Sequence, residues 1–128
     1  MMGDLSRDFN RSEFACRDGC GANQVSARLI DRLQAMRDEV HRPVMIRSGC
    51  RCRPWNAHEG GKPNSAHLAV PEDGELCEAA DLVVPDSATR FDLVAAAILA
   101  GFTRIGIGAD FVHLDVDPQK PQEVLWLY

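Results

Sequence analysis

The segment FVHLDV, residues 111–116, restricts the fold more than any other stretch of the chain. Its apolar and polar residues alternate, and successive side chains of a β-strand point to opposite faces of a sheet. One predicted face is apolar and suits a core, since it carries Val112, Leu114 and Val116. The opposite face carries His113 and Asp115, so a histidine and a carboxylate stand side by side on the less buried side of the strand.

A second predicted strand, EAADLVV at 78–84, divides its residues in the same way. Its apolar face carries Ala80, Leu82 and Val84. Asp81 lies on the other face, between Ala79 and Val83. A carboxylate among small and apolar side chains is costly to bury unless it is paired or bound to a metal. Asp81 is therefore a candidate ion-pair partner or metal ligand.

The spacing of apolar residues predicts two helices. Over 24–40 these residues recur every three or four positions and form one apolar face, at Val25, Leu29, Leu33, Met36 and Val40. Asn23 is the expected N-cap of this helix. The second helix is expected over 88–100, with Asp86 or Ser87 as its N-cap.

Shorter apolar runs predict further strands at 44–47, 103–108 and 124–128. Residues 48–66, rich in Gly, Pro, Ser and Asn, predict a long loop, and such loops are often functional. Helices and strands do not alternate regularly, which favours an α+β fold with a mostly antiparallel sheet and two principal helices. A length of 128 residues favours one domain spanning 1–128, large enough to bury a core without disulfides.

Composition excludes several classes of protein. The chain is 45% apolar and 26% charged, as in ordinary globular proteins. A net charge of −5 argues against a general nucleic-acid or anionic-membrane surface. No apolar run approaches the roughly 20 residues of a membrane span. The N-terminal residues 1–14 lack the apolar stretch of a signal peptide, so we expect synthesis in the cytoplasm. We also expect the protein to be a monomer.

The five cysteines leave two interpretations open. An odd number does not suit a complete disulfide framework. Cys16, Cys20, Cys50 and Cys52, spaced as C-x3-C and C-x-C, offer four ligands for a structural zinc, although this is not a usual zinc-knuckle spacing. The alternative is a set of buried or free thiols, Cys77 included.

Three residues from separate segments form a candidate catalytic zinc site: His67 after the long loop, and Asp81 and His113 in the two strands. Two imidazoles and one carboxylate, with a fourth position open, match the ligand set of catalytic zinc. The simpler interpretations are a polar surface histidine, a carboxylate that accepts a turn hydrogen bond and a half-buried strand histidine. No local period links the three positions.

Three motifs in order, SGCRCRPWNAHEGGKPNSAHL, AADL and RIGIGADFVHLDVD, resemble the zinc D,D-peptidases of bacterial cell walls. That family includes D-alanyl-D-alanine carboxypeptidases and phage endolysins that cut the L-alanyl-D-glutamate bond, and its fold is shared with the hedgehog signalling domain. The resemblance covers nearly the whole chain. It implies a zinc metallopeptidase that acts on peptidoglycan stem peptides of the cell wall.

The resemblance also implies roles for individual residues. His67, Asp81 and His113 match the three zinc ligands of the family. Ser65 matches a serine that helps to hold the substrate, and Arg51 matches an arginine that faces it. A guanidinium suits this task because its planar fork binds a carboxylate through two hydrogen bonds. The alternative for Arg51 is a salt bridge that holds the loop in place.

Two carboxylates compete for the role of general base. Asp110 lies three residues before His113, where the family has an acidic residue. In a regular strand Asp110 and His113 would face opposite ways, unless the strand begins at Phe111 or contains a bulge. Asp115 shares the face of His113, but a carboxylate two residues from a ligand also suits a supporting role. We predict Asp110 as the base and Asp115 as its support.

The chain departs from the family pattern at three places. Thirteen residues separate His67 from Asp81, so the segment around 69–76 is interpreted as an inserted loop whose acidic residues either rim the cleft or form a solvated turn. Cys77 replaces a glycine and Cys50 replaces a tyrosine. An alternative function follows: a zinc-containing module that binds peptidoglycan with little or no catalysis.

Overall fold

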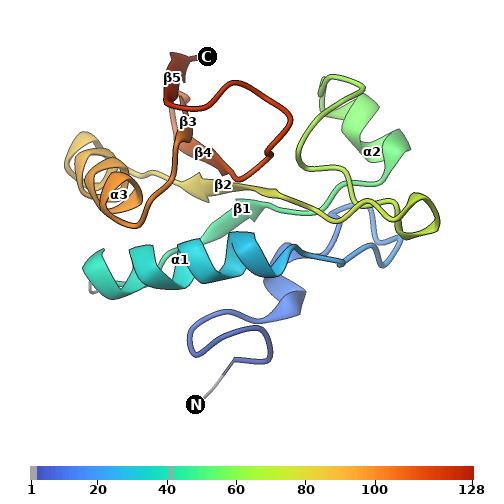
Figure 1. The fold of residues 1–128 in the computed structure, drawn as a ribbon, viewed down its shortest axis with the longest axis horizontal. Coiled ribbons are helices and arrows are strands. Elements are labelled where there is room, and N and C mark those ends of the chain that lie inside the picture. The colour runs from blue at the N-terminus through green and yellow to red at the C-terminus, as the bar shows by residue number, and fades with distance from the viewer. Residues whose placement is uncertain (1–2, 41) are drawn as a thin grey trace.

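The computed structural model describes residues 3–40 and 42–128, and within them it contains one five-stranded sheet (Figure 1). The strands are β1 (Ile46–Ser48), β2 (Ala79–Val83), β3 (Arg104–Ile107), β4 (Phe111–Asp115) and β5 (Val124–Leu127). The α-helices are α1 (Ala27–Val40), α2 (Arg53–His58) and α3 (Ser87–Leu99), and the 3₁₀ helices are η1 (Arg11–Phe14) and η2 (Pro71–Asp73).

The strand order in the sheet is β1-β2-β4-β3-β5. The pairs β1–β2, β2–β4 and β4–β3 are antiparallel, and only β3 and β5 run parallel. The predicted α+β class with a mostly antiparallel sheet is therefore confirmed. β4 lies in the centre, so its side chains are flanked by those of β2 and β3.

The register between β2 and β4 brings the polar residues of both strands together. Asp81 is the direct partner of His113, and Ala79 is the direct partner of Asp115. Directly paired residues of an antiparallel sheet point to the same face. The alternation predicted from the sequence is therefore present, and one face of the central pair carries two carboxylates and a histidine.

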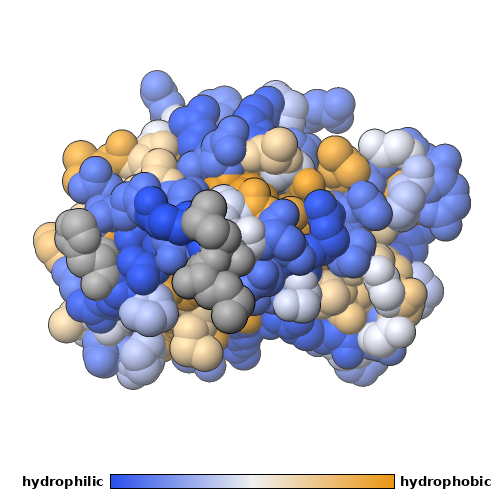
Figure 2. Space-filling view, turned by 90° about the horizontal axis from the view of Figure 1, so that it is seen from below, coloured by the Kyte–Doolittle hydropathy of each residue, from blue (hydrophilic) through white to orange (hydrophobic). Residues whose placement is uncertain are grey.

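The opposite face of the same strands forms the core with the two long helices. The buried apolar cluster includes Leu29, Leu33 and Met36 of α1, Leu93, Ala96 and Ala97 of α3, and Ala80, Leu82, Val112 and Leu114 of the sheet. In Figure 1, α1 and α3 lie below and to the left of the strands, whereas α2 lies at the right. The outer surface on the side of α1 is mainly hydrophilic, with separate apolar side chains (Figure 2).

The start of α1 differs from the prediction. The helix begins at Ala27 rather than Gln24, and the Ser26 hydroxyl, not Asn23, accepts a hydrogen bond from the Leu29 amide. The cause is a bridge between Val25 and Cys77, in which the Gln24 carbonyl and the Ser26 amide bond to the backbone of residue 77. These backbone groups are therefore not free to form a helical turn.

Other boundaries shift by a few residues. β1 begins at Ile46, two residues after the predicted start, and the long loop contains the unpredicted helix α2, with Cys52 as its N-cap residue. For α3 the N-cap is Asp86, whose carboxylate accepts a 2.7 Å hydrogen bond from the Thr89 amide. Within residues 3–40 and 42–128, no helix is long and apolar enough to cross a membrane.

Candidate metal centre

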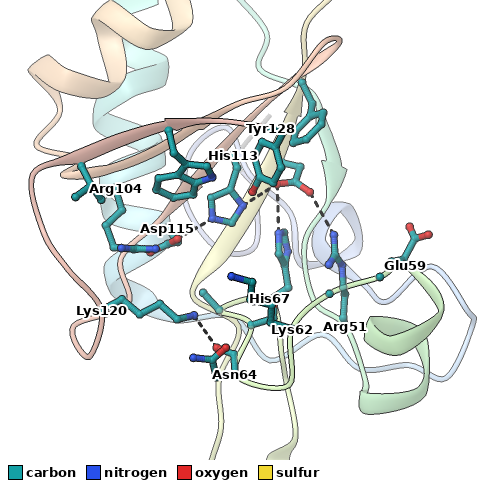
Figure 3. A pocket seen from close by; sticks show the side chains of 18 of the residues that line it. Arg51, Glu59, Lys62, Asn64, His67, Arg104, His113, Asp115, Lys120 and Tyr128 are labelled. Atoms are coloured by element: carbon teal, nitrogen blue, oxygen red, sulfur yellow. Dashed lines mark hydrogen bonds and ion pairs between the residues drawn. The ribbon is translucent and has the colours of Figure 1, made fainter.

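The chain brings His67, Asp81 and His113 together on the polar face of the sheet (Figure 3), and we call them the histidine cluster. One ligand atom of each lies within 4.8 Å of the other two. Asp81 Oδ1 is 2.9 Å from His113 Nδ1 and 3.3 Å from His67 Nε2. All three residues are buried, with exposed fractions of 3%, 8% and 6%.

The outer nitrogen of each imidazole has its own acceptor. His67 Nδ1 donates to the Gly49 carbonyl over 2.7 Å, and His113 Nε2 donates to Asp115 Oδ2 over 2.7 Å. Because both outer nitrogens carry the proton, His67 Nε2 and His113 Nδ1 present lone pairs to the Asp81 carboxylate. When both rings are neutral, these two nitrogens and the Asp81 oxygen are three lone-pair donors that converge on one position, which fits a metal ion.

The pKa shifts of the three residues reflect their burial and the charges of their neighbours. Burial lowers the pKa of His67. Burial also acts to lower the pKa of His113, but the Asp115 and Asp81 carboxylates outweigh it and raise that pKa. Burial acts to raise the pKa of Asp81, yet the close contacts with His113 and His67 hold it below its usual range. The pocket therefore favours an ionised Asp81 and positive charge beside it.

Asp115 binds His113 with one carboxylate oxygen and Arg104 with the other. Its Oδ2 accepts from His113, and its Oδ1 accepts a 2.7 Å hydrogen bond from Arg104 Nε. Arg104 in turn donates to the Pro121 carbonyl and lies over the Trp126 ring, 5.0 Å from the centroid. This buried chain of contacts fixes the orientation of the imidazole, as the support predicted for Asp115 requires.

Asp110 lies apart from the cluster. β4 begins at Phe111, which satisfies the condition for Asp110 to turn toward His113. Its side chain is nevertheless 67% exposed, its Oδ1 lies 2.6 Å from Arg47 Nη1, and it is not among the residues that line the cleft. The structure therefore does not bring the predicted base to the histidine cluster, because an arginine on β1 pairs with it outside.

Arg51 and Ser65 both line the cleft beside the cluster. Arg51 Nη2 lies 3.3 Å from Asp81 Oδ2, and its Nε donates to the Ser48 hydroxyl over 3.2 Å. The Ser65 hydroxyl accepts from the His67 amide over 3.2 Å. In this arrangement Arg51 orients a candidate ligand and Ser65 shapes the turn that carries another, while both stay within reach of a bound molecule.

The segment before His67 is held by Asn56 and a glycine. Asn56 is buried, and its Nδ2 donates to the Lys62 carbonyl over 2.9 Å. A Cβ on Gly61 would lie 2.1 Å from Asn56 Oδ1, so only glycine leaves room for the asparagine here. The Gly-Gly pair at 60–61 therefore serves packing as well as turn geometry, since Gly60 has a φ of +76°.

The cluster lies in a cleft of about 870 Å³. One wall is aromatic and consists of Phe111, Trp126 and Tyr128. Lys62 and Lys120 line the cleft as well, and Lys120 donates to the Asn64 carbonyl (Figure 3). Sequence analysis did not single out the aromatic wall or Arg104. Arg104 alternates with Ile105 and Ile107 in its predicted strand, so the same period-two argument points to it, whereas Trp126 lies in the apolar run VLWLY, which shows no alternation.

The inserted segment stays outside this cleft. Its centre forms η2, closed by a bridge between Val70 and Glu75, and its acidic residues Glu72 and Asp73 are exposed. Asp73 and Glu75 pair with Arg53 of α2. None of these acidic side chains lines the cleft, which agrees with the interpretation of a solvated turn.

Comparison with known proteins identifies the family. The family model described as Peptidase M15 matches residues 5–115, which include the histidine cluster, Arg51 and Ser65. A search among curated proteins gave no match. The matched region spans most of the chain, and its motifs supply the three candidate ligands. The chain therefore belongs to the peptidase M15 family of metal-dependent peptidases.

Proposed function

We propose that this protein is a zinc-dependent peptidase that hydrolyses peptide bonds in peptidoglycan stem peptides. The observation that carries the proposal is the convergence of His67 Nε2, Asp81 Oδ1 and His113 Nδ1 at one point of an open cleft. Two neutral imidazoles and one carboxylate are ligands that zinc prefers in catalytic sites. When bound, zinc supplies a Lewis acid that polarises a carbonyl and lowers the pKa of water to about 7.

The protein keeps the ligands in the state that the metal needs. The Gly49 carbonyl and Asp115 each hold one imidazole in the tautomer whose lone pair faces Asp81. Arg51 binds the second oxygen of Asp81 and leaves Oδ1 for the cluster. With one carboxylate and two neutral rings, the loaded site keeps a net positive charge, which favours a developing oxyanion.

The cleft suits a peptide that carries a carboxylate. Arg51 and Ser65 are the proposed substrate-binding residues, and Lys62 is a further cation that lines the cleft. A guanidinium with one Nη on Asp81 retains N–H groups that can bind a carboxylate. The aromatic wall offers apolar contact for the small side chains of a stem peptide. These features support a D,D-carboxypeptidase or an endopeptidase of the endolysin type.

Asp110 remains the proposed general base. It directly precedes Phe111, which lines the cleft, and its present partner Arg47 is half exposed. An exposed ion pair contributes about 0–1 kcal/mol, so little free energy opposes a turn of the carboxylate toward the cleft. Asp115 is less suited to proton transfer because both of its oxygens already bind partners. It acts as a positioning residue.

The test is incubation of the purified protein with defined muropeptides, with and without zinc, followed by mass spectrometry of the products. We expect zinc-dependent cleavage, and we expect His67→Ala and His113→Ala to lose both bound zinc and cleavage while circular dichroism stays that of the wild type. Full cleavage by a metal-free protein would refute the proposal. Tight muropeptide binding without cleavage would favour the alternative, a binding module, which the outward position of Asp110 supports.

A further inference from the structure

A second group of potential metal ligands lies outside the cleft. Cys16, Asp18, Cys20 and Cys52 each offer one ligand atom, and these atoms lie within 4.8 Å of one another. We call them the cysteine cluster. Three of the residues belong to the tight turn after η1, and Cys52 directly precedes α2. None of the four lines the cleft, so the peptidase site does not account for them.

The distances suit a tetrahedral ion better than a disulfide. The sulfurs of Cys16 and Cys52 are 3.8 Å apart. Two thiolates on a tetrahedral zinc, each about 2.3 Å from the metal, are separated by about 3.8 Å, whereas bonded sulfurs are separated by about 2.0 Å. Asp18 Oδ2 lies 3.0 Å from the Cys52 sulfur, and all five cysteines are free.

The backbone of the turn is arranged around the sulfurs. Gly19 has a φ of +80°, and its amide donates to the Cys16 carbonyl over 3.3 Å, which closes the turn. The Cys20 amide donates to Asp18 Oδ1 over 2.9 Å and leaves Oδ2 for the cluster. Burial raises the pKa of the Cys16 thiol, and the backbone of Asp18 and Cys52 acts in the opposite direction. Amide donors beside a sulfur stabilise the negative charge that a metal-bound thiolate carries.

We propose that Cys16, Asp18, Cys20 and Cys52 bind a structural zinc ion. Three sulfurs and one carboxylate close a tetrahedral site without an open position, as structural sites require, and soft thiolates select zinc over hard divalent cations. The set differs from the four cysteines predicted from the sequence, because Asp18 takes the place of Cys50. The Cys50 sulfur faces the Gln24 carbonyl in the core, away from the cluster.

The ion would hold the N-terminal segment against the cleft. Cys52 adjoins Arg51, which lines the cleft, and the Cys50 amide donates to the Phe14 carbonyl over 2.8 Å. A zinc ion bound by Cys52 and by the turn at residues 16–20 would form a second link between this N-terminal turn and the segment 50–52. The site stabilises the path of the loop and takes no part in hydrolysis.

The test is a zinc count on the full chain purified under reducing conditions. We expect about two zinc ions per chain in the wild type, and about one each in Cys20→Ser and Asp18→Asn, whose side chains are exposed and whose loss leaves no cavity. Cobalt provides the second readout, because sulfur-to-cobalt charge-transfer absorption reports thiolate ligands only. His67→Ala should keep this band, whereas Cys20→Ser should weaken it.

Cys50→Ala is the matched control, since it removes a thiol that lies outside the cluster, and it should leave the zinc count and the cobalt band unchanged. A wild-type count of one that the cysteine variants do not alter, without the cobalt band, would overturn the proposal. A Cys16–Cys52 disulfide in the reduced preparation would also overturn it. Because His67→Ala and Cys20→Ser remove different ions, failure here is distinguishable from failure of the proposed peptidase function.

Discussion

The histidine cluster and the cysteine cluster are built on different kinds of backbone. Asp81 and His113 are direct partners on two central strands and are buried, so the sheet register places them before any ion binds. The cysteine cluster joins a tight turn to the start of a six-residue helix, and two of its members are exposed. A metal at the first cluster is therefore expected to add chemistry, and a metal at the second to add stability.

The largest expected effect concerns the base. Asp110→Asn should lower kcat by about 10²–10⁴-fold, the usual contribution of a general base, while the zinc count stays unchanged because Asp110 contacts no candidate ligand. Arg47→Ala is the matched control, since it frees the carboxylate from its present partner and should leave kcat unchanged or raise it. Steady-state kinetics on a muropeptide measure both. Wild-type turnover in Asp110→Asn would remove Asp110 from the mechanism.

Asp115→Asn, like Asp110→Asn, replaces a carboxylate with an amide, but at a buried residue that contacts His113. The amide cannot accept from both Arg104 and His113 as the carboxylate does, so the imidazole loses its fixed tautomer. We expect zinc affinity to fall by about 10–100-fold, as is typical when a partner of a metal-bound histidine is removed. Competition with a chromophoric chelator measures the affinity. Unchanged affinity with reduced kcat would instead give Asp115 the role assigned to Asp110.

The positions of Asp81, His113 and Asp115 could be predicted because period-two alternation is a local property of the sequence, and the register then follows from burying the apolar faces. His67 could not be derived in this way. It follows a loop whose path depends on Asn56, Gly61 and the Gly49 carbonyl, so its residue type made it a candidate ligand but no periodicity placed it beside the other two.

Several differences between the sequence-based expectations and the structure share one cause, which is a distant partner. Arg47 pairs with Asp110 from β1, and the bridge to Cys77 delays the start of α1. Asp18 enters the cysteine cluster in place of Cys50 because the chain turns into α2 after Cys52, so two cysteines in a C-x-C motif face different surroundings. Sequence spacing alone contains none of these contacts.

Chelation should separate the two clusters by stability. An ion that binds only the folded state stabilises it by about 2.7 kcal/mol at a free concentration one hundred times its Kd. We expect a chelator to lower the unfolding temperature of the wild type the most, because the wild type loses two ions. In His67→Ala the fall should come from the cysteine cluster alone, and in Cys20→Ser it should be smaller. Differential scanning fluorimetry measures these shifts. A shift that disappears in His67→Ala and persists in Cys20→Ser would reverse the assignment of roles.

The smallest expected effect is that of Gly61→Ala, a change in the loop that leads to His67. In Gly61→Ala the new Cβ would overlap Asn56 Oδ1, so the asparagine must move away from the Lys62 carbonyl and from Arg51. Such overpacking costs about 1–3 kcal/mol, which chemical denaturation measures. If the overlap is the cause, Gly61→Ala should lower the free energy of unfolding little in an Asn56→Ala background, because Asn56→Ala removes the clashing oxygen. A double-mutant cycle measures this coupling. If the losses of unfolding free energy in the two single variants add up in the double variant, the glycine serves backbone geometry alone. The position of His67 would then depend on the turn at Ser65 rather than on the packing of Asn56.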